Sequence, residues 1–272
     1  MADIKLIALD LDGTLLTSDK QISEGNLAAL KAAQQQGVKV VLTTGRPLKA
    51  MEFFLHELGT DGQADEYTIT FNGGLVQRNT GEILDKTVFA YDDVARIYEE
   101  TENLGLPLDA ISGGLVYQLQ SDQESLYAEV NPALNFESIA FEDLSSQITY
   151  NKCVTAFAQE PLDAAIPHIS PELFDQYEIF KSREMLLEWS PKNVHKATGL
   201  EKLIAHLGID RSQVMTCGDE ANDRSMIEWA GLGVAMQNAV PEVKEVAEVV
   251  TPMTNDEDAV AWAIETYVIK ED

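Results

Sequence analysis

The sequence predicts an α/β fold, a Rossmann-like doubly wound parallel sheet into which a second, α+β domain is inserted. Strand-like and helical segments alternate over residues 1–84 and again over residues 191–272. Residues 85–190 instead contain paired strand-like runs separated by polar, acidic segments. Because strands that alternate with helices form a parallel sheet covered on both faces, the two ends of the chain are expected to build one sheet.

The first part of this sheet is expected to contain three strands, separated by helices. Ser23 is a predicted N-cap of a helix that Gly37 ends, and Pro47 suits the first turn of a helix that Gly59 closes. The strands are runs of apolar residues around these helices: IKLIALDL at 4–11, VKVVLTT at 38–44 and YTITFNGG at 67–74.

The same alternation returns after the insertion. Leucines at helical spacing predict a helix that ends at Gly208, and NDRSMIEWAG, at 222–231, predicts a helix capped by Gly231. Two further helical segments are expected to finish the chain. The intervening apolar runs predict strands at VMTCGD, 214–219, and LGVAM, 232–236.

The segment between these two parts is interpreted as a separate α+β domain. The alternative is that it continues the same sheet. Its predicted strands are GGLVYQLQ at 113–120, YNKCVTAF at 150–157 and SREMLLEWS at 182–190.

Composition narrows the class of partners. The chain has 46 Asp and Glu against 19 Lys and Arg, a formal net charge of −27, which repels nucleic acid and anionic lipid. We therefore expect no nucleic-acid or membrane partner. The N-terminus lacks a signal-peptide pattern, and no uncharged apolar stretch reaches the length of a membrane span, so a cytoplasmic protein is expected. Cys153 and Cys217 are expected to be buried thiols.

Two carboxylates follow the first predicted strand, in the stretch IALDLDGTLL. Asp10 lies where the strand ends, and ligands of open parallel sheets bind beyond the C-terminal ends of the strands. Asp12 would project to the same side of an extended chain, so the two anions need a nearby cation, for which Mg²⁺ is best suited. Gly13 permits a sharp turn, and Thr14 can hydrogen-bond the turn or a carboxylate. Alone, this stretch could also be a turn with solvated carboxylates.

Three further segments follow strands or begin helices. TTGRP, at 43–47, offers a hydroxyl and backbone N–H groups as an anion cradle, although alone it could be a helix cap. Lys196 precedes a helix, where its ammonium could neutralise a phosphoryl oxygen or a carboxylate, although alone it could be a surface lysine. Asp219 ends another buried strand, with Asn222 and Asp223 in the turn that follows.

Together these segments resemble the motifs of the haloacid dehalogenase superfamily of phosphotransferases: D-x-D-G-T, a Thr or Ser after a strand, a Lys, and G-D-x-x-N-D. All four stand in the family's order, and the resemblance covers the whole chain. The segment between the second and third motifs resembles the type IIB cap of the Cof-type branch. The resemblance therefore implies a discontinuous HAD-like catalytic core of residues 1–84 and 191–272 and a cap of residues 85–190.

The resemblance also implies roles for the motif residues. Asp10 would be the nucleophile and Asp12 the general acid and base, and Mg²⁺ would be held by Asp10, Asp219 and the backbone carbonyl of Asp12. Phosphate would be bound by the Leu11 and Gly45 N–H groups, the Thr44 hydroxyl, Lys196 and Asn222. Asp223 is expected to orient Lys196 or Asn222. Arg46, Asn72 and Gly73 are expected near the substrate, with Arg46 equally suited to pinning its own helix.

The implied activity is Mg²⁺-dependent hydrolysis of small phosphorylated metabolites, sugar phosphates first among them, through an aspartyl-phosphate. A sugar phosphomutase is the alternative enzyme, and a non-enzymatic phospho-aspartate sensor is the alternative of another class. His195 invites an acid-base role, but a packing or hydrogen-bonding histidine is favoured because Asp12 already fills that role. The sequence identifies neither the particular phosphate ester nor the oligomeric state.

Overall fold

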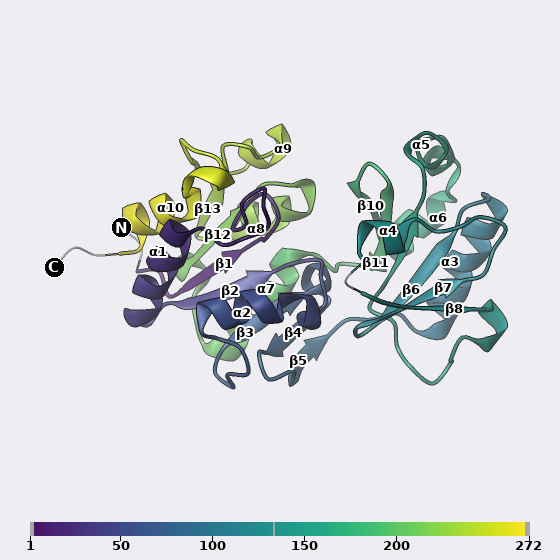
Figure 1. Cartoon of the computed structure of the whole chain (residues 1–272), viewed down its shortest axis with the longest axis horizontal. Coiled ribbons are helices and arrows are strands. Elements are labelled where there is room, and N and C mark those ends of the chain that lie inside the picture. Colours follow the sequence, from purple (N-terminus) through teal and green to yellow (C-terminus); the bar gives the residue numbers. More distant parts are fainter. Residues whose placement is uncertain (1–2, 133, 270–272) are drawn as a thin grey trace. The chain divides into compact units, whose positions relative to one another are not determined.

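The computed structural model describes residues 3–132 and 134–269. The chain forms two compact units (Figure 1). We call Met1–Asp85 together with His195–Asp272 the core unit, and Lys86–Val194 the inserted unit. Within the described ranges, none of the helices has the length and apolar character needed to span a membrane.

The core unit is built on an eight-stranded sheet with the order β14-β13-β12-β1-β2-β3-β4-β5. Neighbouring strands are parallel from β14 to β3, whereas β3 and β4 pair antiparallel. The predicted parallel sheet is therefore confirmed from β14 to β3. The chain turns back directly after β3, which adds the antiparallel strand β4. The strands are β1 Leu6–Leu9, β2 Lys39–Thr43, β3 Tyr67–Thr70, β4 Leu75–Arg78, β5 Ile83–Lys86, β12 Val214–Gly218, β13 Leu232–Ala235 and β14 Val249–Val250.

Helices cover both faces of this sheet, so the core is doubly wound. One apolar cluster joins Ile7 and Leu9 of β1 to α1 and α10, and another joins Leu6 and Ala8 to α7 and α8. Side chains alternate across a strand, so neighbouring residues of β1 supply both clusters. The helices of the core unit are α1 Glu24–Gln35, α2 Glu52–Leu58, α7 Lys196–Leu207, α8 Arg224–Trp229, α9 Pro241–Lys244 and α10 Ala259–Tyr267.

Most of the predicted helix ends are confirmed. The Ser23 hydroxyl accepts a hydrogen bond from the Asn26 N–H at 3.2 Å, and Gly37 follows the end of α1. Gly59 and Gly208 are the C-caps of α2 and α7. Three short strands of the core unit escaped prediction: β4, β5 and β14.

Two predicted helix ends are corrected. Pro47 precedes a 3₁₀ turn, Leu48–Met51, and the α-helix begins only at Glu52. Helix α8 ends at Trp229 and is not capped by Gly231. A Cβ on Gly231 would lie 2.5 Å from the Ser212 Cα, so close backbone packing explains this glycine.

The inserted unit has its own six-stranded sheet, with the order β10-β11-β9-β6-β7-β8, and its own apolar core. Continuation of the core sheet, the alternative for this segment, is therefore wrong. The predicted strand SREMLLEWS is corrected, because Arg183 ends one strand and Leu186 begins the next. The elements are α3 Tyr91–Asn103, β6 Leu108–Ser112, β7 Leu115–Leu119, α4 Tyr127–Val130, β8 Asn135–Ile139, β9 Lys152–Ala156, α5 Gln159–Ala165, α6 Pro171–Gln176, β10 Tyr177–Arg183 and β11 Leu186–Pro191.

Short 3₁₀ turns complete the described structure, and both cysteines are buried, as predicted. The burial of Cys217 raises the pKa of its thiol to about 12, and burial also raises the pKa of the Cys153 thiol. Neither thiol is therefore an activated nucleophile. The 3₁₀ turns are η1 Leu48–Met51, η2 Phe71–Gly73, η3 Phe141–Asp143, η4 Ile166–His168, η5 Arg211–Gln213, η6 Ala221–Asp223 and η7 Asn255–Glu257.

Candidate active site

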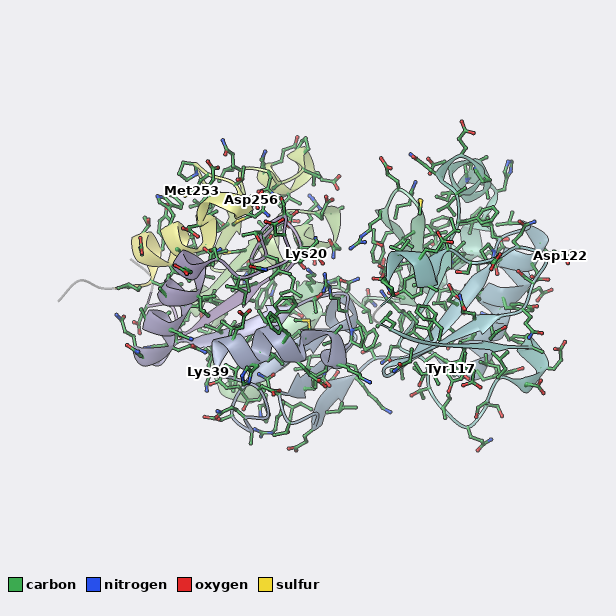
Figure 2. The ribbon with its side chains drawn as sticks, in the orientation of Figure 1. Lys20, Lys39, Tyr117, Asp122, Met253 and Asp256 are labelled. Atoms are coloured by element: carbon green, nitrogen blue, oxygen red, sulfur yellow. The ribbon has the colours of Figure 1, made fainter. Side chains whose placement is uncertain are left out.

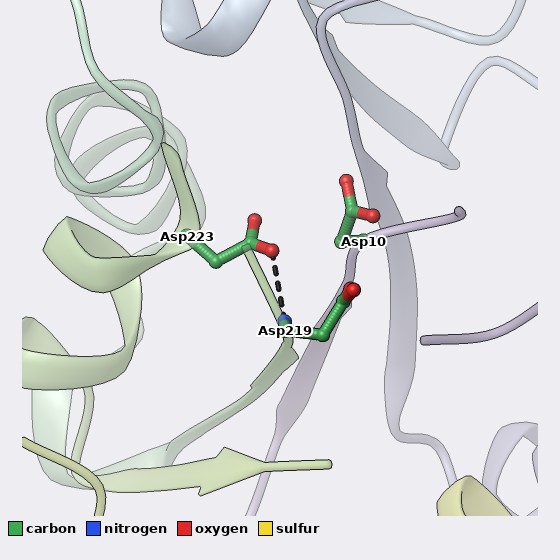
Figure 3. A group of neighbouring side chains, drawn as sticks. All are labelled: Asp10, Asp219 and Asp223. Carbon is green, nitrogen blue, oxygen red and sulfur yellow. Dashed lines mark hydrogen bonds between the residues drawn. The ribbon is translucent and has the colours of Figure 1, made fainter. Parts of the chain in front are cut away.

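Three carboxylates gather beyond the ends of two neighbouring strands of the core sheet. Asp10 follows β1, Asp219 follows β12, and Asp223 lies on the helical turn η6 after β12 (Figure 3). The Asp10 N–H donates to the Cys217 carbonyl at 3.1 Å, so the β1–β12 ladder extends to Asp10. Two carboxylates more than 200 residues apart in sequence are thus brought together by strand pairing.

A single lysine stands within this acidic group. Lys196, the first residue of α7, is fully buried, and its Nζ donates hydrogen bonds to Oδ1 of Asp10 and Oδ1 of Asp223. The other oxygen of Asp223 accepts from the backbone N–H groups of Asp219, at 2.9 Å, and Glu220, at 3.1 Å. Asp223 is therefore held by the backbone and in turn fixes the ammonium of Lys196 against Asp10.

The charges of this group do not balance. When all four groups are ionised, three carboxylates against one ammonium leave two negative charges in a buried place. Burial raises the pKa of Asp10 to about 7 although Lys196 opposes the shift, and burial with the charges of Asp10 and Asp223 raises that of Asp219 to about 8. The pKa of Lys196 is also raised, because its two carboxylate partners outweigh the effect of burial.

The group fits a divalent cation bound by oxygen. Ligand atoms of Asp10, Asp219 and Asp223 lie within 4.8 Å of one another. Both oxygens of Asp223 accept hydrogen bonds, one from Lys196 and the other from the backbone. In Asp219, Oδ1 accepts a hydrogen bond from the Thr14 hydroxyl at 2.7 Å. A Cβ on Gly13 would fall 2.2 Å from Oδ2 of Asp219, so glycine keeps that oxygen accessible. Hard divalent cations prefer such carboxylate oxygens, and one of them would cancel the two excess charges.

Asp12 lies in a different electrostatic setting. Its Oδ1 accepts from Lys20 Nζ at 2.7 Å, and its Oδ2 accepts from the guanidinium of Arg46. Burial raises the pKa of Asp12, but the two cations outweigh it and lower the pKa below its usual value. The expectation that Arg46 pins its own helix is corrected, because its guanidinium binds Asp12 instead. Lys20, labelled in Figure 2, was not expected at the site.

Sequence reasoning missed Lys20 because nothing in its local pattern indicates a contact. Lys20 closes a turn in which its N–H donates to the Thr17 carbonyl at 2.8 Å, and its φ of 61° is unusual for a side chain with a Cβ. Asn238 was also missed. Its Nδ2 donates to the Gly13 carbonyl at 2.8 Å and so supports the turn beside Asp219.

The predicted anion cradle after β2 is a network of short polar contacts. The Thr44 hydroxyl accepts from the Arg46 N–H at 3.2 Å, and the Thr44 carbonyl accepts from the Asn72 N–H at 2.9 Å. A Cβ on Gly45 would lie 3.2 Å from Oδ1 of Asn72, and that oxygen accepts from Asn222 Nδ2 at 3.2 Å. The turn after β2, the turn after β3 and η6 therefore meet at one edge of the sheet.

The remaining predicted residues surround this edge. A Cβ on Gly73 would lie 2.2 Å from the His195 carbonyl oxygen, so this glycine lets the turn after β3 approach the start of α7. His195 is the N-cap of α7, and its Nδ1 accepts from the Thr198 N–H at 3.3 Å, which confirms a hydrogen-bonding histidine. Leu11 is buried, and its carbonyl accepts from the Leu16 N–H at 2.8 Å.

Comparisons with known proteins found a matching family, relatives and solved structures. Residues 7–264 match the family described as haloacid dehalogenase-like hydrolase. The Streptococcus pyogenes protein M6_Spy0533 is 37% identical over 98% of this chain and 99% of its own length. The 5-amino-6-(5-phospho-D-ribitylamino)uracil phosphatase YcsE of Bacillus subtilis is 30% identical over 98% of this chain and 97% of its own. The solved structure of the HAD subclass IIB sugar phosphatase BT4131 has a TM-score of 0.80 at 27% identity and covers 97% of this chain and 98% of its own.

Proposed function

The chain belongs to the haloacid dehalogenase-like hydrolases and is a phosphoric monoester hydrolase, and we propose that it hydrolyses small phosphorylated metabolites, sugar phosphates first among them, with Mg²⁺ as cofactor. The observation that carries the proposal is the carboxylate of Asp10 at the end of β1, held by the buried ammonium of Lys196. A carboxylate so placed can act as a nucleophile toward phosphorus.

In the proposed first step, an oxygen of Asp10 attacks phosphorus as the bond from phosphorus to the leaving oxygen breaks. Asp12 supplies a proton to that oxygen. The phosphoryl oxygens, whose charge must be neutralised during transfer, would be bound by Lys196, the Thr44 hydroxyl, Asn222 and the backbone N–H groups of Leu11 and Gly45.

In the proposed second step, Asp12 takes a proton from water, which then attacks phosphorus and releases Asp10. The two cations on Asp12 favour its carboxylate form, which suits this base role. Because each oxygen of Asp12 accepts from a cation, donation of a proton in the first step requires Lys20 or Arg46 to move away.

Mg²⁺ would be held by the carboxylates of Asp10 and Asp219 and by the backbone carbonyl of Asp12. When bound, it would supply positive charge for the phosphoryl group in an otherwise acidic protein. The two excess negative charges of the buried group support a divalent ion over a monovalent one. Asp223 would remain a positioning residue for Lys196, since backbone N–H groups occupy its second oxygen.

The inserted unit is proposed to act as the cap and to choose the group attached to the phosphate. Sugar phosphates are favoured because BT4131, which this chain resembles in structure, is a sugar phosphatase. We propose that the bacterial sugar phosphatase YidA is a near relative. YcsE, named for a phosphorylated ribityl compound, makes a polyol phosphate the next class to assay. Arg46, Asn72 and Gly73 would border the substrate from the core unit.

The proposal is tested with purified protein, Mg²⁺ and a panel of phosphate esters that includes an aryl phosphate, hexose and tetrose phosphates and a polyol phosphate. Phosphate release is expected with Mg²⁺, lost on chelation and lost in Asp10→Asn. Asp61→Asn, at an exposed carboxylate, is the matched control and should retain full activity. Turnover that persists in Asp10→Asn would reject the mechanism, and an isomerised sugar phosphate without free phosphate would identify a mutase.

A further inference from the structure

Thr43, the last residue of β2, carries a hydroxyl that has no role in the proposed reaction steps. The side chain is fully buried, and within the described part of the chain its Oγ1 has no hydrogen-bond partner. A buried hydroxyl without a partner costs free energy, and valine would fit a strand equally well without that cost. The hydroxyl therefore needs a functional explanation.

The register of the sheet places Thr43 beside Asp10. Strands β1 and β2 are parallel and pair residue by residue up to Leu9 and Leu42. The next residues, Asp10 and Thr43, are thus neighbours across the two strands. Neighbouring strands lie about 4.8 Å apart, a separation that one side-chain hydrogen bond can span.

The two side chains also face the same side of the sheet. Ala8 and Val41, two residues earlier on each strand, belong to the apolar cluster that includes Leu200 of α7. Because side chains alternate along a strand, Asp10 and Thr43 project toward α7 as well. The contact between Asp10 and Lys196, at the start of α7, agrees with this placement.

The other neighbour of Thr43 locates it beneath the first turn of α7. Thr43 pairs with Ile69 of β3, and a Cβ on Gly199 would lie 2.8 Å from Cγ2 of Ile69. The hydroxyl therefore lies in the layer between the sheet and the turn that carries Lys196. Buried polar groups at this turn include Asp10, Lys196 and Asp223.

We propose that Thr43 is a positioning residue whose hydroxyl donates a hydrogen bond to the Asp10 carboxylate and holds it in line for attack on phosphorus. This inference rests on the proposed nucleophilic role of Asp10. Lys196 binds one oxygen of Asp10, and a second donor from the neighbouring strand would restrict rotation of the carboxylate. A change of the Thr43 side-chain rotamer would turn Oγ1 toward that carboxylate.

The test compares Thr43→Val with Thr43→Ser. Valine keeps the shape and removes the hydroxyl, so kcat is expected to fall about tenfold, the effect of losing one hydrogen bond to a charged group. KM should stay within about twofold, and the melting temperature should change little, because the side-chain rotamer of the free protein leaves the hydroxyl without a partner within the described residues. Serine keeps the hydroxyl and should restore most of kcat.

Thr68→Val is the matched control. Thr68 is a buried threonine of β3 whose hydroxyl donates to Oδ1 of Asn79 at 2.6 Å, so this variant should lose stability and keep kcat. Unchanged kcat in Thr43→Val would overturn the inference, as would a Thr43→Ser variant as slow as the valine variant. Activity that is lost in Asp10→Asn but complete in Thr43→Val would reject the role of Thr43 and leave the proposed function in place.

Discussion

The core unit and the inserted unit both bury charged side chains, but they compensate these charges differently. In the core unit, Lys196 faces Asp10 and Asp223 while Asp219 lies nearby, so negative charge is in excess. In the inserted unit, Lys152 and Glu188 form a buried ion pair at 2.7 Å. The charges of the buried pair in the inserted unit therefore cancel, whereas those of the buried group in the core unit do not.

This difference separates a structural role from a functional one. A buried pair with equal and opposite charges fixes the packing of β9 against β11 and requires no bound ion to neutralise it. An unbalanced group with raised pKa values at the ends of parallel strands indicates a site that binds a cation and does chemistry. The following three predictions test this contrast, from the largest expected effect to the smallest.

Breaking the balanced pair should destabilise the inserted unit strongly. Lys152→Met leaves Glu188 buried without its lysine, and removal of one partner of a buried pair costs about 3–5 kcal/mol. Hydrogen exchange of β9 and β11, together with urea unfolding, measures the loss. The double variant Lys152→Met with Glu188→Gln removes both charges and should recover most of it. Equal instability of the single and double variants would contradict the view that charge balance matters here.

Asp109, in β6 of the inserted unit, should make stability depend on pH. Burial raises the pKa of Asp109 to about 7, against the hydrogen bonds of Ser125 and Gln118 that lower it. The unfolded chain loses this proton near pH 4, so the contribution to stability is complete below that pH and is lost as the pH rises through about 7.

The unfolding free energy of the wild type should therefore fall by a few kcal/mol between pH 5 and pH 8. In Asp109→Asn this fall should be absent. Urea unfolding at several pH values measures it. Asp122→Asn, at the exposed carboxylate labelled in Figure 2, is the control and should follow the wild-type pH profile. A pH profile unchanged in Asp109→Asn would mean that the carboxyl is ionised in the folded protein.

Binding of Mg²⁺ in the core unit should release protons. Because the pKa of Asp10 is about 7 and that of Asp219 about 8 in the metal-free protein, the ion must displace protons below pH 8. Apparent affinity should thus rise by up to about tenfold per pH unit for each proton displaced, that is, by up to about a hundredfold from pH 6 to pH 7 and about tenfold from pH 7 to pH 8. Titration calorimetry in two buffers counts the protons. Asp219→Asn should weaken binding and flatten this dependence, whereas a pH-independent affinity in the wild type would contradict the pKa assignments.

The sequence predicted much of the core unit because its strands and helix caps are specified by residues that are adjacent in the chain. The apolar runs located β1, β2, β3 and β12, and the residues that follow β1 and β12 then identified Asp10 and Asp219 as neighbours. Caps such as Ser23 and Gly208 depend on a few adjacent residues, so they too were predicted correctly.

Contacts between side chains of different turns and segments could not be predicted in this way. The pairing of Asp12 with Lys20 and Arg46 depends on how two turns meet in space, and neither turn carries a pattern that specifies it. The same holds for Gly231, whose neighbour Ser212 lies in another segment, and for β4, whose direction depends on the tight turn η2.

The central claim is that Asp10 becomes phosphorylated, and trapping the intermediate tests it most directly. The protein is mixed with Mg²⁺ and a hydrolysed phosphate ester, quenched in acid and digested, and the peptides are analysed by mass spectrometry. The account predicts one phosphoryl group on the peptide containing Asp10 and none in Asp10→Asn, which should also lack turnover. A phosphoryl group on another residue, or turnover that continues in Asp10→Asn, would contradict it.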